Sequence, residues 1–246
     1  MMAADACFYK QHIQPKDTFA TLFYSQDPHG SVNILHTQIS KLVMKRKTVA
    51  ILLTSLIVSA IAYAQTGKPA GDWLGVPGPI SFENKSFGLS WSSHPAPNFY
   101  KQEYLVKGEP ADNYKTMILI DVVTGRTNVR NVVAAKLDEL KKMKEANPVI
   151  NYEVIDNPAT GEYMIDFLLT ANAPDGTITI VERNVYRYKT FTDKKGKKGI
   201  MLFGVSTRGY GADVTKFLTG LKANRKDGMN KVAAYKMPEL NIKNSF

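Results

Sequence analysis

The sequence predicts an α+β domain built on a single antiparallel β-sheet of about 7–8 strands, with two main helices packed on one side of the sheet. Three observations lead to this fold class. Residues 149–207 form extended segments separated by short turns rich in Gly, Pro, Asn and Asp, and short turns join antiparallel neighbours. After Gly125 the apolar residues change from an extended to a helical period. A second stretch with helical period begins near Asp213.

Four extended segments precede the first helix: residues 80–83, 87–92, 99–106 and 115–123. The first two form a predicted hairpin around a turn at residues 84–86, because apolar residues alternate along the second segment. Two prolines make residues 94–98 a predicted loop. Residues 117–123 are nearly all apolar, which is typical of a central strand buried on both faces.

The first helix is predicted from an apolar stripe at three- and four-residue spacing. The stripe consists of Val129, Val132, Val133, Leu137, Leu140 and either Met143 or Lys144. Thr127 or Asn128 can cap its start, and Asn147-Pro148 ends it. Lys136 and the lysines near the C-terminal end lie off the stripe or on its edge, so we expect them to face solvent.

Four strands follow, at residues 149–156, 162–171, 177–191 and 200–207. The second helix begins at Ala212 or Asp213, with Val214 and Phe217 on its apolar face. The string Gly209-Tyr210-Gly211 before it has Val214 where a G-x-G-x-x-G phosphate-binding loop has its third small residue, and the strands around it are antiparallel in our prediction. We therefore expect a glycine-containing turn there.

The chain divides into five segments. Residues 1–43 are a leader that we do not expect in the mature protein, and residues 44–64 are a signal peptide. Residues 65–79 are a lead-in rich in Gly and Pro, in which Trp73 and Leu74 can dock on the core. The α+β domain spans 80–225, and residues 226–246 are a tail or a short helix.

The signal peptide starts at Met44 and has three parts. Basic residues 45–47 precede an uncharged apolar run, and Ala62 and Ala64 supply an A-x-A cleavage motif. The run is too short to span a bilayer comfortably. We expect export to the periplasm or cell exterior, with an uncleaved signal anchor as the alternative. The leader implies either that translation begins at Met44 or that a cytosolic extension precedes the signal.

Export changes the composition that matters for function. The single cysteine, Cys7, and all histidines except His94 precede the predicted cleavage point. Residues 65–246 contain 26 Lys and Arg against 19 Asp and Glu, a net charge of +7. A basic exported protein can bind anionic lipid headgroups, anionic glycans or an envelope protein. Nucleic acid is not an expected partner outside the cell.

The short string Ser86-Phe87-Gly88-Leu89-Ser90-Trp91, with Pro95 soon after it, lies in the predicted hairpin. In this string and in its order of elements, the chain resembles the Mog1/PsbP-like family of small lumenal and periplasmic proteins. The resemblance covers most of residues 80–225 and implies a fold only. No functional residue of that family can be placed on this sequence.

The segment that follows the predicted signal peptide lacks the residue combinations of the common catalytic sites. One histidine and no cysteine cannot form a His/Cys zinc site, and His94 lies in a proline-containing loop without a G-x-S-x-G nucleophile motif. We predict no catalytic residues, metal site or cofactor. A carboxylate pair such as Glu162 and Asp166 leaves a hydrolase as one alternative.

Two surfaces are candidate binding sites. On one sheet face, Asp166 is expected opposite Arg183 and Glu162 opposite Arg187, either as surface ion pairs or as part of a ligand site. The other proposed ligand-binding residues are Lys189, Tyr186 and Tyr188, although the tyrosines are also typical of a core. At a hairpin tip, Lys194, Lys195, Lys197 and Lys198 surround Gly196, either as an ordinary solvated turn or as an element that contacts an anionic surface.

The sequence therefore predicts an exported, non-catalytic module that binds a partner or ligand in the periplasm or cell envelope. A carboxylate-dependent hydrolase and a structural subunit of an envelope assembly are the alternatives. The identity of the partner does not follow from the sequence.

Overall fold

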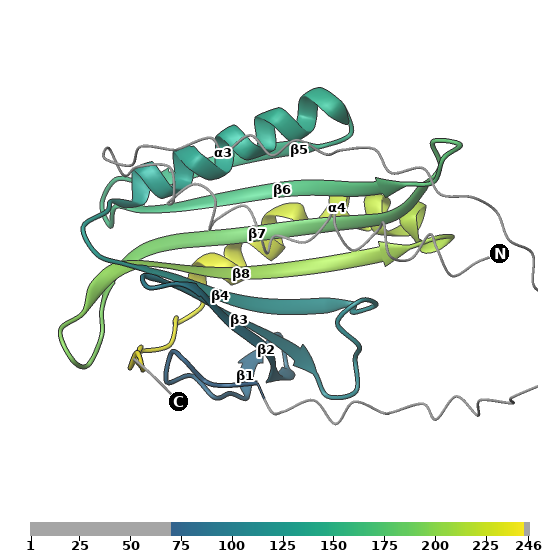
Figure 1. Cartoon of the computed structure of the whole chain (residues 1–246). Helices are drawn as coiled ribbons and strands as arrows, with labels where there is room; N and C mark the ends of the chain where they lie inside the picture. Colours follow the sequence, from purple (N-terminus) through teal and green to yellow (C-terminus); the bar gives the residue numbers. More distant parts are fainter. Residues whose placement is uncertain (1–69, 244–246) are drawn as a thin grey trace, which may run out of the picture. The chain divides into compact units, whose positions relative to one another are not determined.

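The computed structural model describes residues 70–243, which are arranged around one curved, eight-stranded antiparallel sheet (Figure 1). The strand order is β1-β2-β3-β4-β8-β7-β6-β5. The elements are β1 (Ile80–Phe82), β2 (Lys85–Ala96), β3 (Phe99–Val106), β4 (Thr116–Thr124), α3 (Val129–Ala146), β5 (Asn151–Asn157), β6 (Glu162–Asn172), β7 (Ile178–Thr192), β8 (Lys198–Tyr210) and α4 (Asp213–Ala234). The predicted α+β class with a single antiparallel sheet is confirmed.

The predicted leader and signal peptide lie outside the described residues, as do residues 65–69 of the lead-in and 244–246 of the tail. Neither α3 nor α4 is long and apolar enough to cross a membrane.

Helix α3 makes the one long connection between successive strands of this sheet. It carries the chain from β4, near the middle, to β5 at the far edge, and β6, β7 and β8 then return to pair with β4. The strands curve into a half-barrel. Of the two predicted caps of α3, Thr127 and Asn128, the structure has Asn128, whose side-chain oxygen accepts a hydrogen bond of 2.8 Å from the Asn131 amide.

The two helices cover opposite faces of the sheet, whereas the sequence analysis placed both on one side. Helix α3 packs on one face with Leu119 of β4, while α4 packs on the other face with Ile118 and Ile120. The central strands β4 and β8 place apolar side chains on both faces, so each face needs its own cover. The nearly continuous apolar run in β4 was the sequence signal for this arrangement.

The lead-in and the tail belong to the folded domain, which extends beyond residues 80–225. Leu74 and Ile242 are fully buried on the α4 face. Backbone hydrogen bonds of 2.8 Å join Asn241 to Leu74 and Lys243 to Trp73. Helix α4 continues to Ala234, past the predicted domain boundary, and residues 235–243 are extended.

The first two turns differ from the prediction. Glu83 and Asn84 form the turn between β1 and β2, with φ values of 47° and 60°, as a two-residue type I′ turn requires. Strand β2 continues through the predicted loop to Ala96, because irregular pairing between Ser93 and Ala96 accommodates Pro95.

Candidate functional site

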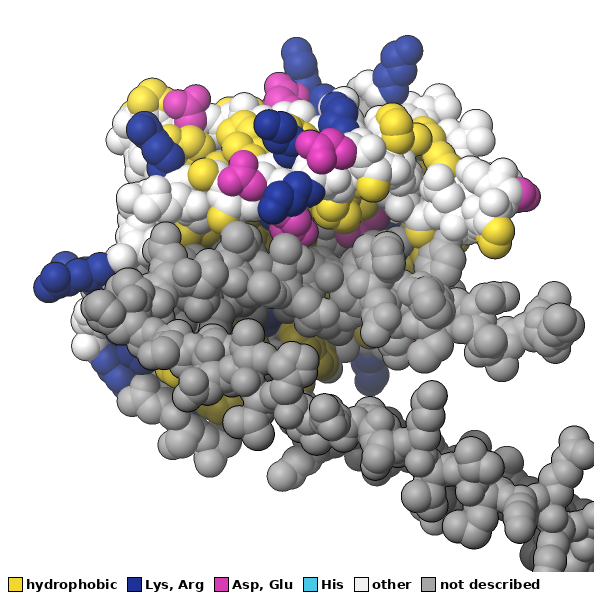
Figure 2. Space-filling model, turned by 45° about the horizontal axis from the view of Figure 1, so that its top comes forward, with side chains coloured by type: hydrophobic (Ala, Val, Ile, Leu, Met, Phe, Trp, Pro, Cys, Tyr) yellow, Lys and Arg dark blue, Asp and Glu magenta, His cyan; other side chains and the backbone are white. Residues whose placement is uncertain are grey.

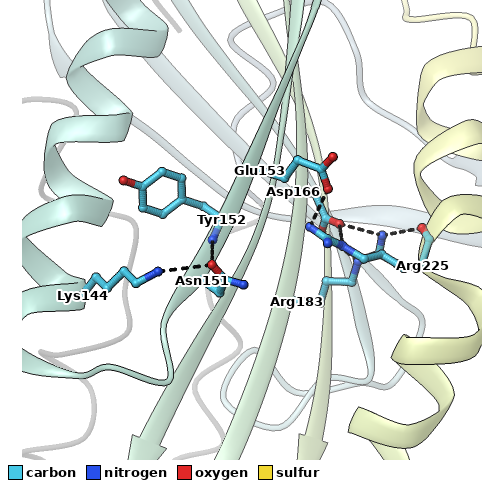
Figure 3. Close-up of polar contacts among 7 residues, drawn as sticks. All are labelled: Lys144, Asn151, Tyr152, Glu153, Asp166, Arg183 and Arg225. Carbon is cyan, nitrogen blue, oxygen red and sulfur yellow. Dashed lines mark hydrogen bonds and ion pairs between the residues drawn. The ribbon is translucent and has the colours of Figure 1, made fainter.

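An ion-pair cluster joins three strands to α4 on one face of the sheet (Figure 3). Asp166 of β6 is buried and binds Arg183 of β7 through both carboxylate oxygens, at 2.9 and 3.2 Å. Arg225 of α4 donates to the same carboxylate at 2.5 Å and pairs with Glu153 of β5 at 3.1 Å. Arg183 also donates to the Arg225 carbonyl at 2.8 Å. The cluster therefore fixes α4 to the sheet.

A second pair works in the same way near the C-terminal end of α4. Arg187 pairs with Glu162 at 2.7 Å and donates to the carbonyl oxygens of Val232 and Tyr235, at 3.3 and 2.9 Å. The last carbonyls of a helix lack partners within the helix and carry partial negative charge. Arg187 supplies both the missing donors and the opposite charge.

The predicted pairs form, but in a different register. Asp166 lies opposite Val185, and Arg183 lies opposite Leu168. The register is shifted by two residues for two reasons. The loop between Asn172 and Ile178 is longer than predicted, and β7 has one extra residue between Ile178 and Ile180, which forms a bulge opposite Ala171 and Asn172. The ion pairs are consequently diagonal. They also lie beneath α4, whereas the sequence analysis expected an open sheet face.

The remaining predicted ligand-binding residues do not join this cluster. Tyr186 and Tyr188 point to the opposite face, where both pack in the core beneath α3. Lys189 lies further along β7, opposite Met201 and partly buried, and has no ion pair with another described residue. The seven residues proposed as one ligand site are therefore divided between the two faces of the sheet.

The face beneath α3 contains a buried polar cluster that we define as Lys101, Asp121, Lys136, Glu139, Tyr186 and Tyr188. Lys101 lies 3.6 Å from Asp121, and Lys136 lies 3.0 Å from Glu139. The second oxygen of Asp121 and both tyrosine hydroxyls have no hydrogen-bond partner among the described residues. Burial raises the pKa of the Asp121 carboxyl, although Lys101 and Lys136 act to lower it.

Lys136 is the member of this cluster that departs furthest from the sequence prediction. Its side chain is buried against the rings of Phe167 and Tyr186, with its ammonium group 5.0 and 5.8 Å from their centroids. Cation–π contacts and the Glu139 pair compensate for lost hydration. A lysine next to an apolar stripe gave no sequence signal of burial, since lysine is almost always exposed.

A further polar network near the start of β4 was also missed. Glu182 accepts hydrogen bonds from Tyr114 at 2.8 Å and Asn184 at 2.9 Å, and it pairs with Arg208. Asn184 in turn accepts from Ser206. Glu182 and Asn184 flank Arg183 in a run of three polar residues, which is typical of a solvent-exposed segment, so no sequence signal indicated that both side chains are buried.

Shallow grooves run along α4, and most of their charged side chains form ion pairs. A groove of about 490 Å³ lies between β8 and the first half of the helix, and one of about 340 Å³ lies beside the second half. Lys115 and Asp213 form an ion pair of 3.9 Å in the first. Lys231 binds both Glu83 and Asp227 at 2.6 Å in the second. Neither groove presents an unpaired cluster of charge.

The residues considered for catalysis make other contacts in the structure. His94 is stacked on Tyr100 with ring centroids 4.1 Å apart, and its Nδ1 lies 2.9 Å from the Phe99 carbonyl oxygen. Glu162 and Asp166 are each occupied by an arginine. Within residues 70–243, no three His, Cys, Asp or Glu side chains lie close enough together to hold a metal ion.

The basic hairpin, which we define as Asp193–Lys198 between β7 and β8, presents lysines on a fixed turn. Lys194, Lys195 and Lys198 are exposed, and Lys197 lies over the ring of Tyr100, 5.9 Å from its centroid. Asp193 is only 5% exposed. One of its oxygens accepts from the amides of Lys195 and Lys197, at 2.9 and 2.7 Å.

The C-terminal segment also holds the basic hairpin. The second Asp193 oxygen accepts from the Ile242 amide at 3.3 Å, and the Lys194 amide donates to the Leu240 carbonyl at 3.1 Å. Because Leu240 and Ile242 are buried, the turn is anchored to the core through them. The charged tip is therefore part of the rigid fold.

A protein-family model matches residues 74–237. The chain belongs to that family. The family match begins at buried Leu74 and ends at buried Met237, so it includes part of the lead-in and all of α4. Neither curated proteins nor solved structures give a match to the chain. The resemblance to Mog1/PsbP-like proteins stays a prediction.

Proposed function

We propose that the protein is an exported, non-catalytic module that docks on an anionic surface through its basic hairpin. The observation that carries this proposal is the fixed conformation of the hairpin. Asp193 and the C-terminal segment hold the turn, while three lysine side chains remain exposed. A preorganised site loses less conformational entropy on binding than a flexible one does.

The distribution of charge supports the same surface. On the face seen in Figure 2, basic and acidic side chains are interspersed over the upper part. Basic side chains protrude at the left margin, which is the side of the β7–β8 turn in Figure 1. The acidic residue paired with this tip is Glu239, 3.7 Å from Lys194, and both side chains are largely exposed. Such a pair is weak in water and can yield to an anionic surface.

The anionic surface that we favour is a membrane. The lead-in runs beside the C-terminal segment, since Trp73 bonds to Lys243, and that segment contacts the hairpin. Five residues separate the end of the predicted signal from Ala70, and five residues span at most about 18 Å. If the signal is retained as an anchor, it would hold the hairpin close to the bilayer. If the signal is cleaved, the protein would bind the membrane through charge alone.

Vesicle binding of the exported protein tests this proposal. We expect binding to phosphatidylcholine vesicles that contain phosphatidylglycerol, weakening as salt is added, and little binding to pure phosphatidylcholine. Each lysine near an anionic surface contributes about 1 kcal/mol. Replacing Lys194, Lys195 and Lys198 with Ala should therefore weaken binding by about 100-fold.

The matched control replaces Lys141, Lys142 and Lys222 with Ala, because these lysines are also exposed but lie on α3 and α4. Both triple variants lose the same charge. If the two variants weaken binding equally, net charge alone is responsible and the hairpin has no special role. Absence of binding by the unaltered protein would also reject the proposal.

A further inference from the structure

Strand β5 is the outer strand at one edge of the sheet, with β6 as its only neighbour. An edge strand leaves every second amide and carbonyl unpaired, and these groups can bind another strand. The Tyr152 amide bonds to the Asn151 side chain at 3.1 Å rather than to a strand. Because the pattern alternates along an antiparallel strand, the backbone groups of Val154 and Asp156 also point away from β6.

Exposed apolar side chains mark the same edge. In the part of the chain that the structure describes, Val149 and Val154 are the only large hydrophobic residues that are exposed, at 41% and 38%. Val154 is in β5 and Val149 lies two residues before it. Scattered single apolar residues on a surface are ordinary, but Val154 lies at the middle of an edge strand, whereas Val149 lies in the turn before it.

Both helices hold β5 in place from its two faces (Figure 3). On one face, Lys144 of α3 donates to Asn151 at 3.3 Å and lies over the ring of Tyr152, 5.7 Å from its centroid. On the other face, Glu153 pairs with Arg225 of α4. These contacts hold the first three residues of β5, whose outer edge is therefore positioned for pairing.

We propose that β5 pairs with β5 of a second copy, antiparallel and centred on Val154, to form a symmetric dimer. Val154 is the midpoint of the strand, so this register is the one that pairs all of Asn151–Asn157. Val154 of one copy then covers Val154 of the other copy at the two-fold axis.

Charge favours this register over the one centred on Glu153. Glu153 lies opposite Ile155 of the second copy, and Asp156 lies opposite Tyr152 of the second copy. Lys144, which already covers Tyr152, is then beside the opposing Asp156. A register centred on Glu153 would instead place two carboxylates face to face, which is unfavourable. A second copy therefore complements this edge in apolar contact, hydrogen bonding and charge.

A cysteine at the two-fold axis tests the dimer directly. The protein has no cysteine after Cys7, so an exported Val154→Cys variant has one thiol. Hydrogen-bonded partners across an antiparallel pair have Cα atoms about 5.5 Å apart, within disulfide range. We expect Val154→Cys to form a covalent dimer under mild oxidation, and Val149→Cys, outside the paired strand, to remain largely monomeric.

The mass of the unaltered exported protein is the second measurement. Sedimentation should give a dimer that dissociates on dilution, and Val154→Lys should be monomeric while Val149→Lys, with the same added charge, stays dimeric. A monomer at every concentration, or equal cross-linking at both positions, overturns the proposal. The result is separable from vesicle binding, because replacing the hairpin lysines should leave the dimer intact.

Discussion

At the scale of single residues, the main feature is the set of polar groups buried beneath α3. Three polar atoms, on Asp121, Tyr186 and Tyr188, are buried beneath this helix without a partner among the described residues. An ionised group in such a place is costly, and Lys101 at 3.6 Å offsets only part of that cost. The Asp121 carboxyl should therefore make stability depend on pH.

The sign of this dependence follows from the raised pKa of Asp121. In the unfolded chain this carboxyl has a pKa of about 3.9, so the folded state holds the proton more tightly at intermediate pH. The stabilisation by the protonated Asp121 carboxyl is therefore fully present below the pKa of the unfolded state, and it is lost as the pH rises through the pKa of the folded state. In chemical denaturation, the unfolding free energy of the wild type minus that of Asp121→Asn should fall as the pH rises. A difference that rises with pH would contradict the raised pKa.

Asp166 offers a second test at this scale. The Asp166→Ala change leaves Arg183 buried without its carboxylate, and breaking a buried pair in this way costs about 3 kcal/mol of unfolding free energy. Glu153→Ala is the matched control, because it removes a half-exposed carboxylate from the same Arg225 and should cost about 0.5 kcal/mol or less. Equal losses in urea denaturation would show that Asp166 does not hold α4 in place.

At the scale of elements, most strands and the two helices were predictable because they carry a clear period, although the ends of β2 and α4 were predicted too early. Residue type placed the start of each helix within one residue, at Thr127 or Asn128 for α3 and at Ala212 or Asp213 for α4. The register between β6 and β7 did not, since it depends on a bulge and a loop that the sequence does not mark. The position of α4 over Arg183 and Arg187 could not be predicted either, because arginines in an alternating strand favour a solvated face.

Two glycines in α4 test how closely this helix approaches the sheet. A Cβ atom at Gly228 would lie 2.6 Å from Arg183 Nη1, whereas one at Gly220 would meet nothing within 4 Å. Gly220→Ala should raise the unfolding free energy by about 1 kcal/mol through helix propensity. Gly228→Ala should lower it by about 1 kcal/mol, because Arg183 is held by Asp166 and cannot move aside cheaply. Thermal unfolding of both variants measures this difference, and a gain at Gly228 would show a looser contact.

At the scale of the whole molecule, the helices and both ends of the described chain leave two features exposed: the basic hairpin and the edge of β5. The sequence identified the first, because four lysines around a glycine are visible as a pattern. It did not identify the second, since β5 becomes an edge only through the order of the strands. In a dimer the protein would carry two basic hairpins, and two weak contacts to one surface bind far more tightly than one.

The most direct test asks whether the hairpin itself touches an anionic membrane. Thr177 and Thr192 are both exposed and flank opposite ends of β7. Each can be replaced by Cys and labelled with a polarity-sensitive fluorophore, since the exported protein has no other thiol. The account predicts a blue-shifted emission on anionic vesicles for the label at position 192, next to the hairpin, and no change at position 177. Vesicle binding with equal shifts at both positions, or with none at position 192, would contradict it.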